Sequence, residues 1–332
     1  MAIAATSGGI LDLNQALYDY GVMGDTVIVI NAASNNTIYT WEGNDTVYTT
    51  RVNAGFIQDI YLGFENDRFF GGACADYVRD GKGNDTVYLG DGIDRAYVGE
   101  GNDYIDGGAN TDFLFFNERY VSDNGASVPN YNPVTVDLLK TTAQNLGYFG
   151  IDTLLNFENI VGSNAADKLY GTNGANILSG SAGNDLIDGR AGDDSINGDQ
   201  GADIIIGGAG KDTMLGGPDI AAARDTFRYL ALTDSTASTA TSDIIQLFDT
   251  GVTATDDRID LSAIDTNAAM AGDQGFVWRN TLAFTTSSAW EVRLQVSGAD
   301  TIVQVDNDSD TAAEMVILVQ GVTGLTSWDF IL

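Results

Sequence analysis

The sequence has no histidine, one cysteine and three prolines. The absence of histidine excludes Ser-His-Asp and Cys-His nucleophilic chemistry and the H-E-x-x-H zinc proteases. Cys74 stands alone, so neither a disulfide framework nor a C-x-x-C motif is available, and we expect a small buried thiol in a turn. No stretch approaches the roughly 18 consecutive apolar residues of a membrane-spanning helix. The sequence therefore predicts no transmembrane segment.

Basic residues and glutamate are also scarce. Lys and Arg number 15 against 47 Asp and Glu, which gives a formal net charge of −32. Only 7 of the 47 acids are Glu, which leaves 40 Asp (47 minus 7). Aspartate suits turns and calcium sites, whereas the negative charge argues against nucleic acid and anionic membrane surfaces as partners. The start, residues 1–9, lacks the basic and apolar regions of a signal peptide, so we expect any export to use another route.

Gly and Asp recur in the chain with a period of nine residues. The first run of acids is Asp67, Asp76, Asp85, Asp94, Asp103 and Asp112. The second run is Asp167, Asn176, Asp185, Asp194, Asp203 and Asp212, in which one position is an amide. Two positions after each of these residues stands a mostly apolar residue, for example Val87 or Ile205.

Glycines precede each acid in the order G-G-x-G-x-D-x-U-x, where U is apolar. The block 207–212 matches this order fully. Good matches end at Asp85, Asp94, Asp103, Asp185, Asp194 and Asp203. Degraded blocks end at Asp67, Asp76, Asp112 and Asp167, and a weak prelude at Asn36 and Asp45 falls out of register before Asp67. A disordered Gly/Asp linker is disfavoured because it would lack the apolar residue in each repeat.

The spacing predicts a coil of 18 residues. Six Gly-rich residues can reverse the chain, and the three residues centred on U form a short strand, so one nonapeptide makes half a coil. Residues i and i+18 then stack about 4.8 Å apart, which places Asp85 beside Asp103 and Asp185 beside Asp203. Such carboxylates repel by about 1 kcal/mol per pair in water and by more when shielded from it. Ca²⁺, which binds six to eight oxygens, would relieve this repulsion.

This nonapeptide resembles the repeats-in-toxin (RTX) calcium-binding repeat. The resemblance implies an all-β fold, a parallel β-roll (right-handed β-solenoid) with a C-terminal β-sandwich-like cap, in which each Ca²⁺ lies between turns two repeats apart. The implied metal ligands are Asp67, Asp76, Asp85, Asp94, Asp103, Asp112, Asp167, Asn176, Asp185, Asp194, Asp203 and Asp212. Each run of six gives four i/i+18 pairs, so these runs would hold up to about eight ions.

The remaining segments suggest a spacer and a cap. Residues 117–149 interrupt the repeats, and Ile160 re-enters the nine-residue phase. Residues 225–265 resemble the C-terminal domain of serralysin-type proteases and the terminal module of mannuronan C5-epimerases, although extra residues before Asp225 put a calcium role for it in doubt. We expect these parts: an N-terminal cap at 1–23, degraded-to-good repeats at 24–116, a spacer at 117–149, a β-roll at 150–217 and a C-terminal cap at 218–332.

Two motifs near the C-terminus allow alternative interpretations. Asp306, Asp308 and Asp310 are spaced like the start of an EF-hand, but Thr311 and Ile317 stand where glycine and the bidentate Glu belong. A hairpin turn is therefore the favoured interpretation. The last residues, 329–332, are an acid followed by three apolar residues, and they resemble the uncleaved signal of type I secretion substrates.

Three functions are compatible with these patterns. The first is a secreted, non-enzymatic calcium-binding protein that is unfolded in the cell, folds on Ca²⁺ outside it, and binds a cell surface, a matrix or a polysaccharide. The second is a Ca²⁺-dependent β-helix lyase or epimerase, for which the spacer offers Arg119, Tyr120, Lys140 and Tyr148. The third is an accessory partner of a secreted protease. The implied partners are the bacterial type I secretion machinery and an extracellular ligand. Ser181 does not form the nucleophile elbow of a hydrolase, because the leading glycine of that motif and histidine are both absent from the sequence.

Overall fold

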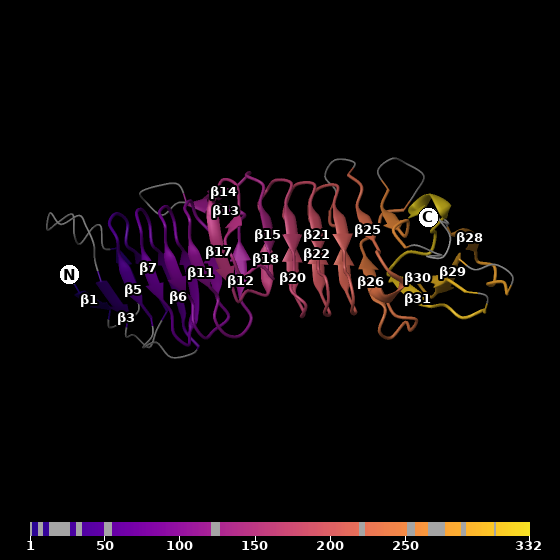
Figure 1. Cartoon of the computed structure of the whole chain (residues 1–332), viewed down its shortest axis with the longest axis horizontal. Coiled ribbons are helices and arrows are strands. Elements are labelled where there is room, and N and C mark those ends of the chain that lie inside the picture. The colour runs from indigo at the N-terminus through magenta and orange to yellow at the C-terminus, as the bar shows by residue number, and fades with distance from the viewer. Residues whose placement is uncertain are drawn as a thin grey trace. The chain divides into compact units, whose positions relative to one another are not determined.

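The computed structural model is built almost entirely of strands (Figure 1). It describes residues 2–5, 9–12, 27–30, 35–49, 55–120, 127–218, 223–250, 256–264, 276–286, 290–308 and 310–332. The chain forms two compact units, Met1–Ala165 and Ala166–Leu332. Among the described residues, no helix is long and apolar enough to cross a membrane.

Unit 1 consists of two sheets whose strands alternate along the chain. The first sheet contains β1 (Ala2–Ala5), β3 (Val27–Ile30), β5 (Thr46–Tyr48), β7 (Arg68–Phe70), β9 (Thr86–Tyr88), β11 (Tyr104–Asp106), β17 (Ile151–Leu155) and β16 (Gln144–Asn145). The second contains β2 (Gly9–Asp12), β4 (Asn36–Tyr39), β6 (Ile57–Tyr61), β8 (Ala75–Arg79), β10 (Arg95–Tyr97), β12 (Phe113–Phe115) and β18 (Asn159–Val161). Neighbouring strands are parallel except β16 with β17, and Val87 pairs with Ile105, so one coil takes 18 residues as predicted.

The predicted spacer is an excursion from this coil. The chain leaves after β12, forms the antiparallel pair β13 (Glu118–Tyr120) and β14 (Ser127–Pro129), and continues through β15 (Thr135–Asp137). It then returns in β17, which pairs with β11, and in β18, where Ile160 pairs with Leu114. The expectation that Ile160 resumes the apolar position of the repeat is therefore confirmed.

Unit 2 repeats the two-sheet arrangement. One sheet contains β19 (Lys168–Tyr170), β21 (Leu186–Asp188), β23 (Ile204–Ile206), β25 (Thr226–Arg228), β27 (Arg258–Asp260) and β32 (Phe330–Ile331). The other contains β20 (Ile177–Ser179), β22 (Ser195–Asn197), β24 (Thr213–Leu215), β26 (Asp243–Gln246), β31 (Met315–Val319), β30 (Asp300–Asp306), β29 (Glu291–Ser297) and β28 (Val277–Asn280). Two short 3-10 helices, η1 (Leu232–Asp234) and η2 (Ser327–Asp329), complete it.

The apolar residue of each repeat forms the core. Its neighbours on either side in the three-residue strand are less buried, because successive side chains of a strand alternate between faces. The buried positions, all at most 2% exposed, are Phe69, Val78, Val87, Ala96, Ile105, Leu114, Ile160, Leu169, Leu178, Ile187, Ile196, Ile205 and Met214. One apolar side chain per half coil thus gives each unit a narrow, continuous core.

The outward face of unit 1 carries a stack of aromatic rings. Phe70 stacks on Tyr48 and on Tyr88 with ring centroids 5.0 and 5.6 Å apart and interplanar angles of 11°. Tyr88 in turn lies 5.3 Å from Tyr104. These cross-strand ring contacts stabilise the pairing of the parallel strands that carry them.

The C-terminal part of unit 2 extends the coil with antiparallel strands. Strands β29, β30 and β31 form an antiparallel meander, and β31 pairs in parallel with β26. The favoured hairpin interpretation of residues 306–310 is confirmed, because they connect β30 to β31. Residues 13–23 of the expected N-terminal cap lie outside the described residues. The five-part division of the chain stays a prediction.

Candidate metal-binding ladder

The repeat acids form a ladder of hydrogen bonds from coil to coil. The backbone N–H of Asp85 donates to Oδ1 of Asp103 at 2.8 Å, and that of Asp185 donates to Oδ1 of Asp203 at 2.8 Å. Each carboxylate therefore caps the backbone of the acid one coil earlier, and the predicted stacking of these two pairs is confirmed. The equivalent bonds start from the N–H groups of Asp67, Asp76, Asp94, Asp167, Asn176 and Asp194.

The ladder continues where the nine-residue spacing fails. In unit 1 the N–H of Asp103 donates to Asp152 Oδ1, 49 residues away, at 2.8 Å, and that of Asp112 donates to Glu158 Oε2 at 2.9 Å. Glu158 could have been found from the sequence, because it stands two residues before Ile160 and nine before Asp167, in the acid position of the repeat. Asp152 is out of phase with both runs, and the spacer separates it from Asp103, so spacing does not indicate it.

The same continuation occurs in unit 2 beyond Asp212. The N–H of Asp203 donates to Asp225 Oδ1 at 2.9 Å, and that of Asp212 donates to Asp243 Oδ1 at 2.9 Å. Asp225 in turn donates to Asp257 Oδ1 at 3.0 Å. Asp225 thus takes a place in the ladder although it does not follow Asp212 at nine residues, and its calcium role stays a prediction.

The second oxygen of these carboxylates is the unusual feature. Within the described residues, a buried Oδ2 atom without a hydrogen-bond partner is found in Asp85, Asp94, Asp103, Asp112, Asp152, Asp185, Asp194, Asp212 and Asp243. These side chains are at most 3% exposed. A buried polar atom with no partner costs roughly 1–3 kcal/mol, and more when it is charged. A row of buried carboxylate oxygens supplies the hard oxygen ligands that Ca²⁺ binds.

Burial makes these carboxylates hard to ionise without a cation. Burial, which outweighs the hydrogen bond from the preceding coil, raises the pKa of Asp185, Asp194 and Asp212 to about 7. Burial likewise raises the pKa of Asp152 and Asp243 to about 8, with Asp103 and Asp212 respectively adding repulsion. At neutral pH the ladder therefore favours any ligand that neutralises charge.

The glycines of unit 2 leave room beside these oxygens. A Cβ atom added to Gly180 would collide with Asp185 Oδ2 and with the carbonyl oxygen of Gly198 in the next coil. Gly189 has the same relation to Asp194 Oδ2 and the carbonyl oxygen of Gly207. Carboxylate and carbonyl oxygens thus converge on space that only glycine keeps open, and this donor set fits Ca²⁺.

Unit 1 lacks this open space at several coils. The first glycine position of the repeats ending at Asp67, Asp94 and Asp103 is occupied by Leu62, Leu89 and Val98. These three side chains are at most 2% exposed and belong to the core. The two runs have the same acid spacing but differ at the first glycine position. In the second run, this position is glycine in the repeats that end at Asp185, Asp194, Asp203 and Asp212.

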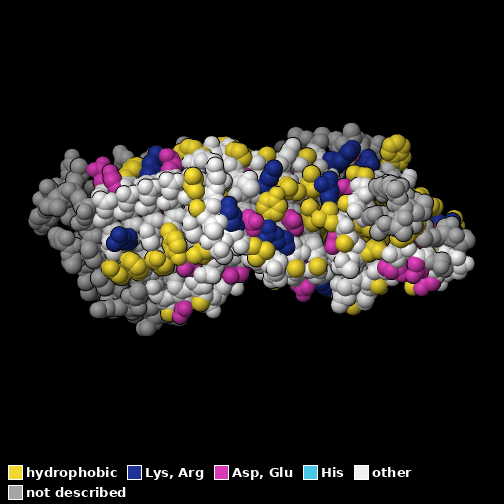
Figure 2. Space-filling model, viewed as in Figure 1, with side chains coloured by type: hydrophobic (Ala, Val, Ile, Leu, Met, Phe, Trp, Pro, Cys, Tyr) yellow, Lys and Arg dark blue, Asp and Glu magenta, His cyan; other side chains and the backbone are white. Residues whose placement is uncertain are grey.

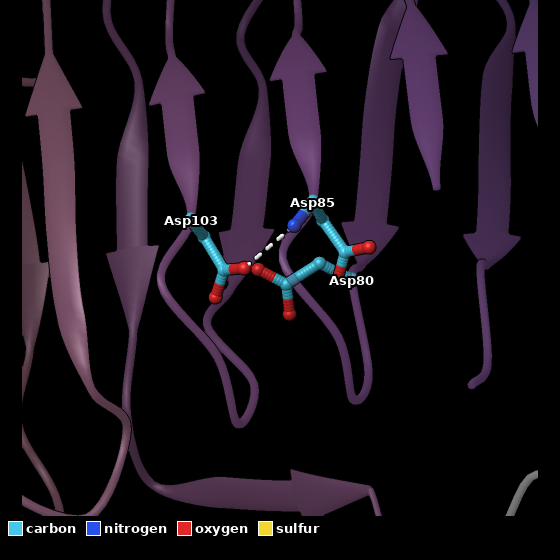
Figure 3. A group of neighbouring side chains, drawn as sticks. All are labelled: Asp80, Asp85 and Asp103. Atoms are coloured by element: carbon cyan, nitrogen blue, oxygen red, sulfur yellow. Dashed lines mark hydrogen bonds between the residues drawn. The ribbon is translucent and has the colours of Figure 1, made fainter. Parts of the chain in front are cut away.

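Asp80 takes the same position in the repeat that ends at Asp85. One carboxylate oxygen from each of Asp80, Asp85 and Asp103 lies within 4.8 Å of the others, and all three side chains are buried. Figure 3 shows the three carboxylates directed toward one another between adjacent coils, with the N–H of Asp85 bonded to Asp103. Burial, then repulsion from Asp103 and Asp85, raises the pKa of Asp80 well above its ordinary value. The nine-residue spacing of acids does not predict Asp80 as a ligand, because Asp80 stands in a glycine position of the repeat.

Two predicted ligands have other partners in the structure. Both oxygens of Asp76 accept hydrogen bonds, Oδ1 from Cys74 Sγ at 3.2 Å and Oδ2 from Thr49 Oγ1 at 3.0 Å. Oδ1 of Asn176 accepts from the N–H of Thr172 at 2.8 Å. Cys74 and Thr172 make these bonds within the turn, whereas Thr49 reaches Asp76 from an earlier coil, and Cys74 is buried as expected.

Burial of the ladder aspartates also affects how much acidic charge the surface exposes. The face seen in Figure 2 shows acidic side chains in scattered groups among neutral and hydrophobic ones, despite the net charge of −32. Many of the aspartates of the repeats are buried, including the eleven of the two runs at 67–112 and 167–212, which are each at most 3% exposed. Part of the acidic charge therefore lies in the buried ladder and is not exposed on this face.

Replacing Asp80 by glycine restores the repeat consensus, yet we expect it to weaken calcium binding by unit 1. The substitution removes one of three convergent carboxylates, and ligand charge is a main determinant of affinity for Ca²⁺. Isothermal titration of the whole chain should show the tightest unit 1 event weakened about tenfold or lost. Asp91→Asn, which neutralises an exposed acid of the same run, should leave the isotherm unchanged. Equal or tighter binding by Asp80→Gly would show that Asp80 is not a ligand.

The parallel coils and the carboxylate ladder together define a β-roll of calcium-binding repeats. The family model for the RTX calcium-binding nonapeptide repeat matches residues 32–53, 61–96 and 88–118. The family model for the peptidase M10 serralysin C-terminal domain matches residues 150–332, and the chain belongs to this family. The matched segments are repeat and C-terminal modules, neither of which is a catalytic domain.

Several solved structures are similar to parts of the chain. The AlgE6R3 and AlgE6R2 subunits of the mannuronan C5-epimerase of Azotobacter vinelandii are 26% and 28% identical. Their matches cover 52% and 53% of this chain and 80% and 92% of theirs, with TM-scores of 0.25 and 0.27. The extracellular lipase LipA of Serratia marcescens is 14% identical over 85% of this chain and 45% of its own, with a TM-score of 0.31. No curated protein sequence gives a significant match.

Proposed function

We propose that this protein is a secreted, non-enzymatic calcium-binding protein whose repeats fold when Ca²⁺ fills the carboxylate ladder outside the cell. The observation that carries the proposal is the row of buried aspartates that each give one oxygen to the adjacent coil and keep a second without a hydrogen-bond partner in the described structure, as in Asp185 and Asp194. Calcium supplies positive charge and accepts several oxygen ligands at once.

Unit 2 offers the better-formed sites. Asp185, Asp194 and Asp212 combine an available oxygen with an adjacent glycine turn, and they would hold ions together with carbonyl groups of neighbouring coils. In unit 1 the group of Asp80, Asp85 and Asp103 would hold an ion by carboxylates alone. Leu62 and Leu89, which stand in the glycine position beside Asp67 and Asp94, favour fewer ions in unit 1. We therefore expect the whole chain to bind fewer than about eight Ca²⁺ ions.

The export part of the proposal depends on the calcium difference across the cell boundary. Extracellular modules bind Ca²⁺ at roughly 10⁻⁴–10⁻³ M, and ions that bind only the folded state stabilise it by mass action. Inside the cell the chain would stay unfolded and fit for type I secretion. In the folded unit 2, Asp329 and Phe330 of the proposed signal are buried and β32 pairs with β27, so this signal would be read before folding.

Export and folding can be tested together in a bacterium with a type I secretion system. The full chain should be recovered from calcium-containing medium in a protease-resistant form, whereas chain retained in the cell should be protease-sensitive. Retention of a protease-resistant chain in cells, with none in the medium, would contradict the proposal. The proposed target class is a cell surface, an extracellular matrix or a polysaccharide.

An enzymatic function is the alternative, and it can be separated by assay. Of the spacer residues that could serve a lyase or epimerase, Lys140 is exposed and the Tyr148 hydroxyl is hydrogen-bonded to Glu100 Oε1. A lyase would release unsaturated sugars from alginate or pectate, which absorb in the ultraviolet, whereas a binding protein would only co-sediment with the polymer. Pull-down of a secreted protease would instead support an accessory role.

A further inference from the structure

A second carboxylate cluster lies outside the ladder, at the turn between β30 and β31. One carboxylate oxygen from each of Asp306, Asp308 and Glu314 lies within 4.8 Å of the others. Asp306 ends β30, Glu314 directly precedes β31, and the antiparallel pairing of the strands brings them together, since Val305 pairs with Met315. None of the three belongs to a nonapeptide repeat.

Turn formation explains part of this cluster. Oδ1 of Asp306 accepts the N–H of Asp308 at 3.0 Å, and Oδ1 of Asp308 accepts the N–H of Asp310 at 2.7 Å. Oε2 of Glu314 accepts the N–H of Asn307 at 2.8 Å. Such side-chain bonds to nearby backbone are the ordinary reason for finding Asp in a turn.

The other oxygen of Asp306 is not explained by the turn. Asp306 is 0% exposed, and its Oδ2 atom accepts no hydrogen bond from any described residue. Its cross-strand partner Glu291 is also acidic, but Glu291 has its own partners in Thr285 at 2.7 Å and Arg279 at 3.7 Å. The buried carboxylate of Asp306 therefore has the carboxylates of Asp308 and Glu314 as neighbours and one oxygen without a hydrogen bond from a described residue, which is a costly arrangement without a cation.

We propose that the turn binds one Ca²⁺ through Asp306, Asp308 and Glu314, separately from the repeat ladder. The three carboxylates come from both sides of a hairpin, and the hydrogen bonds that they accept from the N–H groups of Asn307, Asp308 and Asp310 hold the turn in place. Ca²⁺ accommodates this irregular oxygen set better than Mg²⁺, which demands near-ideal octahedral geometry. The site is not an EF-hand, because Thr311 and Ile317 occupy the positions of its glycine and bidentate Glu.

The site can be tested by counting the ions bound to the folded chain. Native mass spectrometry of the whole protein at saturating Ca²⁺ should show one ion fewer in Asp306→Asn and in Glu314→Gln than in the wild type. Asp306→Asn keeps the oxygen that accepts from Asp308 and removes the charge. Asp310→Asn is the matched control, because it neutralises an exposed acid of the same turn that lies outside the cluster, and it should bind as many ions as the wild type.

Far-UV circular dichroism of each variant separates ion loss from misfolding. If Asp306→Asn does not fold, Glu314→Gln and Asp308→Asn, which alter less buried side chains, provide the comparison. Ion counts equal to the wild type in every folded variant of Asp306, Asp308 and Glu314 would overturn this site. This result can be distinguished from failure of the ladder. If the ladder bound no Ca²⁺, the wild type would still bind the one ion of this turn, and these variants would not.

Discussion

Acidification should fold the calcium-free chain. The carboxylates of Asp185, Asp194 and Asp212 have a pKa of about 7 in the folded state, raised by burial from an ordinary value of 3.8. A group with a raised folded-state pKa takes up protons on folding, so the stability linked to it is complete below its ordinary pKa and is lost as pH rises through about 7. Protons would then replace Ca²⁺ as the neutralising ligand of the ladder.

The measurement is far-UV circular dichroism in metal-free buffer as the pH is lowered from about 8 to about 5. The β-sheet signal should increase over this range, and the hydrodynamic radius should decrease with it. With excess Ca²⁺, the same change of pH should have little effect between 8 and 6, because the ladder is already neutralised. A calcium-free chain that is equally unfolded at both ends of the range would contradict the expected linkage.

Neutralising one ladder acid of unit 2 should have opposite effects with and without calcium. Asn in place of Asp194 keeps the Oδ1 acceptor for the N–H of Asn176 but removes a charged ligand. The Ca²⁺ concentration at half-maximal folding should rise about tenfold, because ligand charge sets calcium affinity. In metal-free buffer the same variant should fold at a higher pH than the wild type, because one buried carboxylate no longer has to be protonated.

Asp193→Asn is the control for this prediction. Asp193 is adjacent in sequence and carries the same charge, but it is exposed, and its Oδ1 accepts the N–H of Lys211 at 2.9 Å. General electrostatics predicts equal effects for the two substitutions, whereas a ligand role predicts a large effect for Asp194 alone. Equal shifts of the calcium midpoint would show that net charge, and not the ladder, controls folding.

The regular part of the fold follows from local spacing. Because one repeat makes half a coil, the positions of Ile196, Ile205 and the acids that precede them determine both the core and the in-run ladder. These features could be predicted because each depends only on residues nine or 18 positions apart, and the structure places them accordingly.

The remaining features depend on closure in three dimensions. Asp152 and Asp243 join the ladder across insertions whose length has no relation to the period, so spacing could not reveal them. Asp80 stands where the consensus has glycine, and Leu89 fills the same position in the next repeat. A count of in-phase acids treats these repeats as equal, although the space beside each acid differs. Glu314 was missed because only strand pairing brings it to Asp306.

The central claim is that calcium binding to the ladder drives folding. Far-UV circular dichroism and hydrodynamic radius should be followed at about pH 7.5 from excess chelator to about 10 mM Ca²⁺, with Mg²⁺ as the control ion. The account predicts a cooperative gain of β-signal and compaction with Ca²⁺ and little change with Mg²⁺. A chain that is already compact and β-rich in chelator, with no further change on adding Ca²⁺, would contradict it.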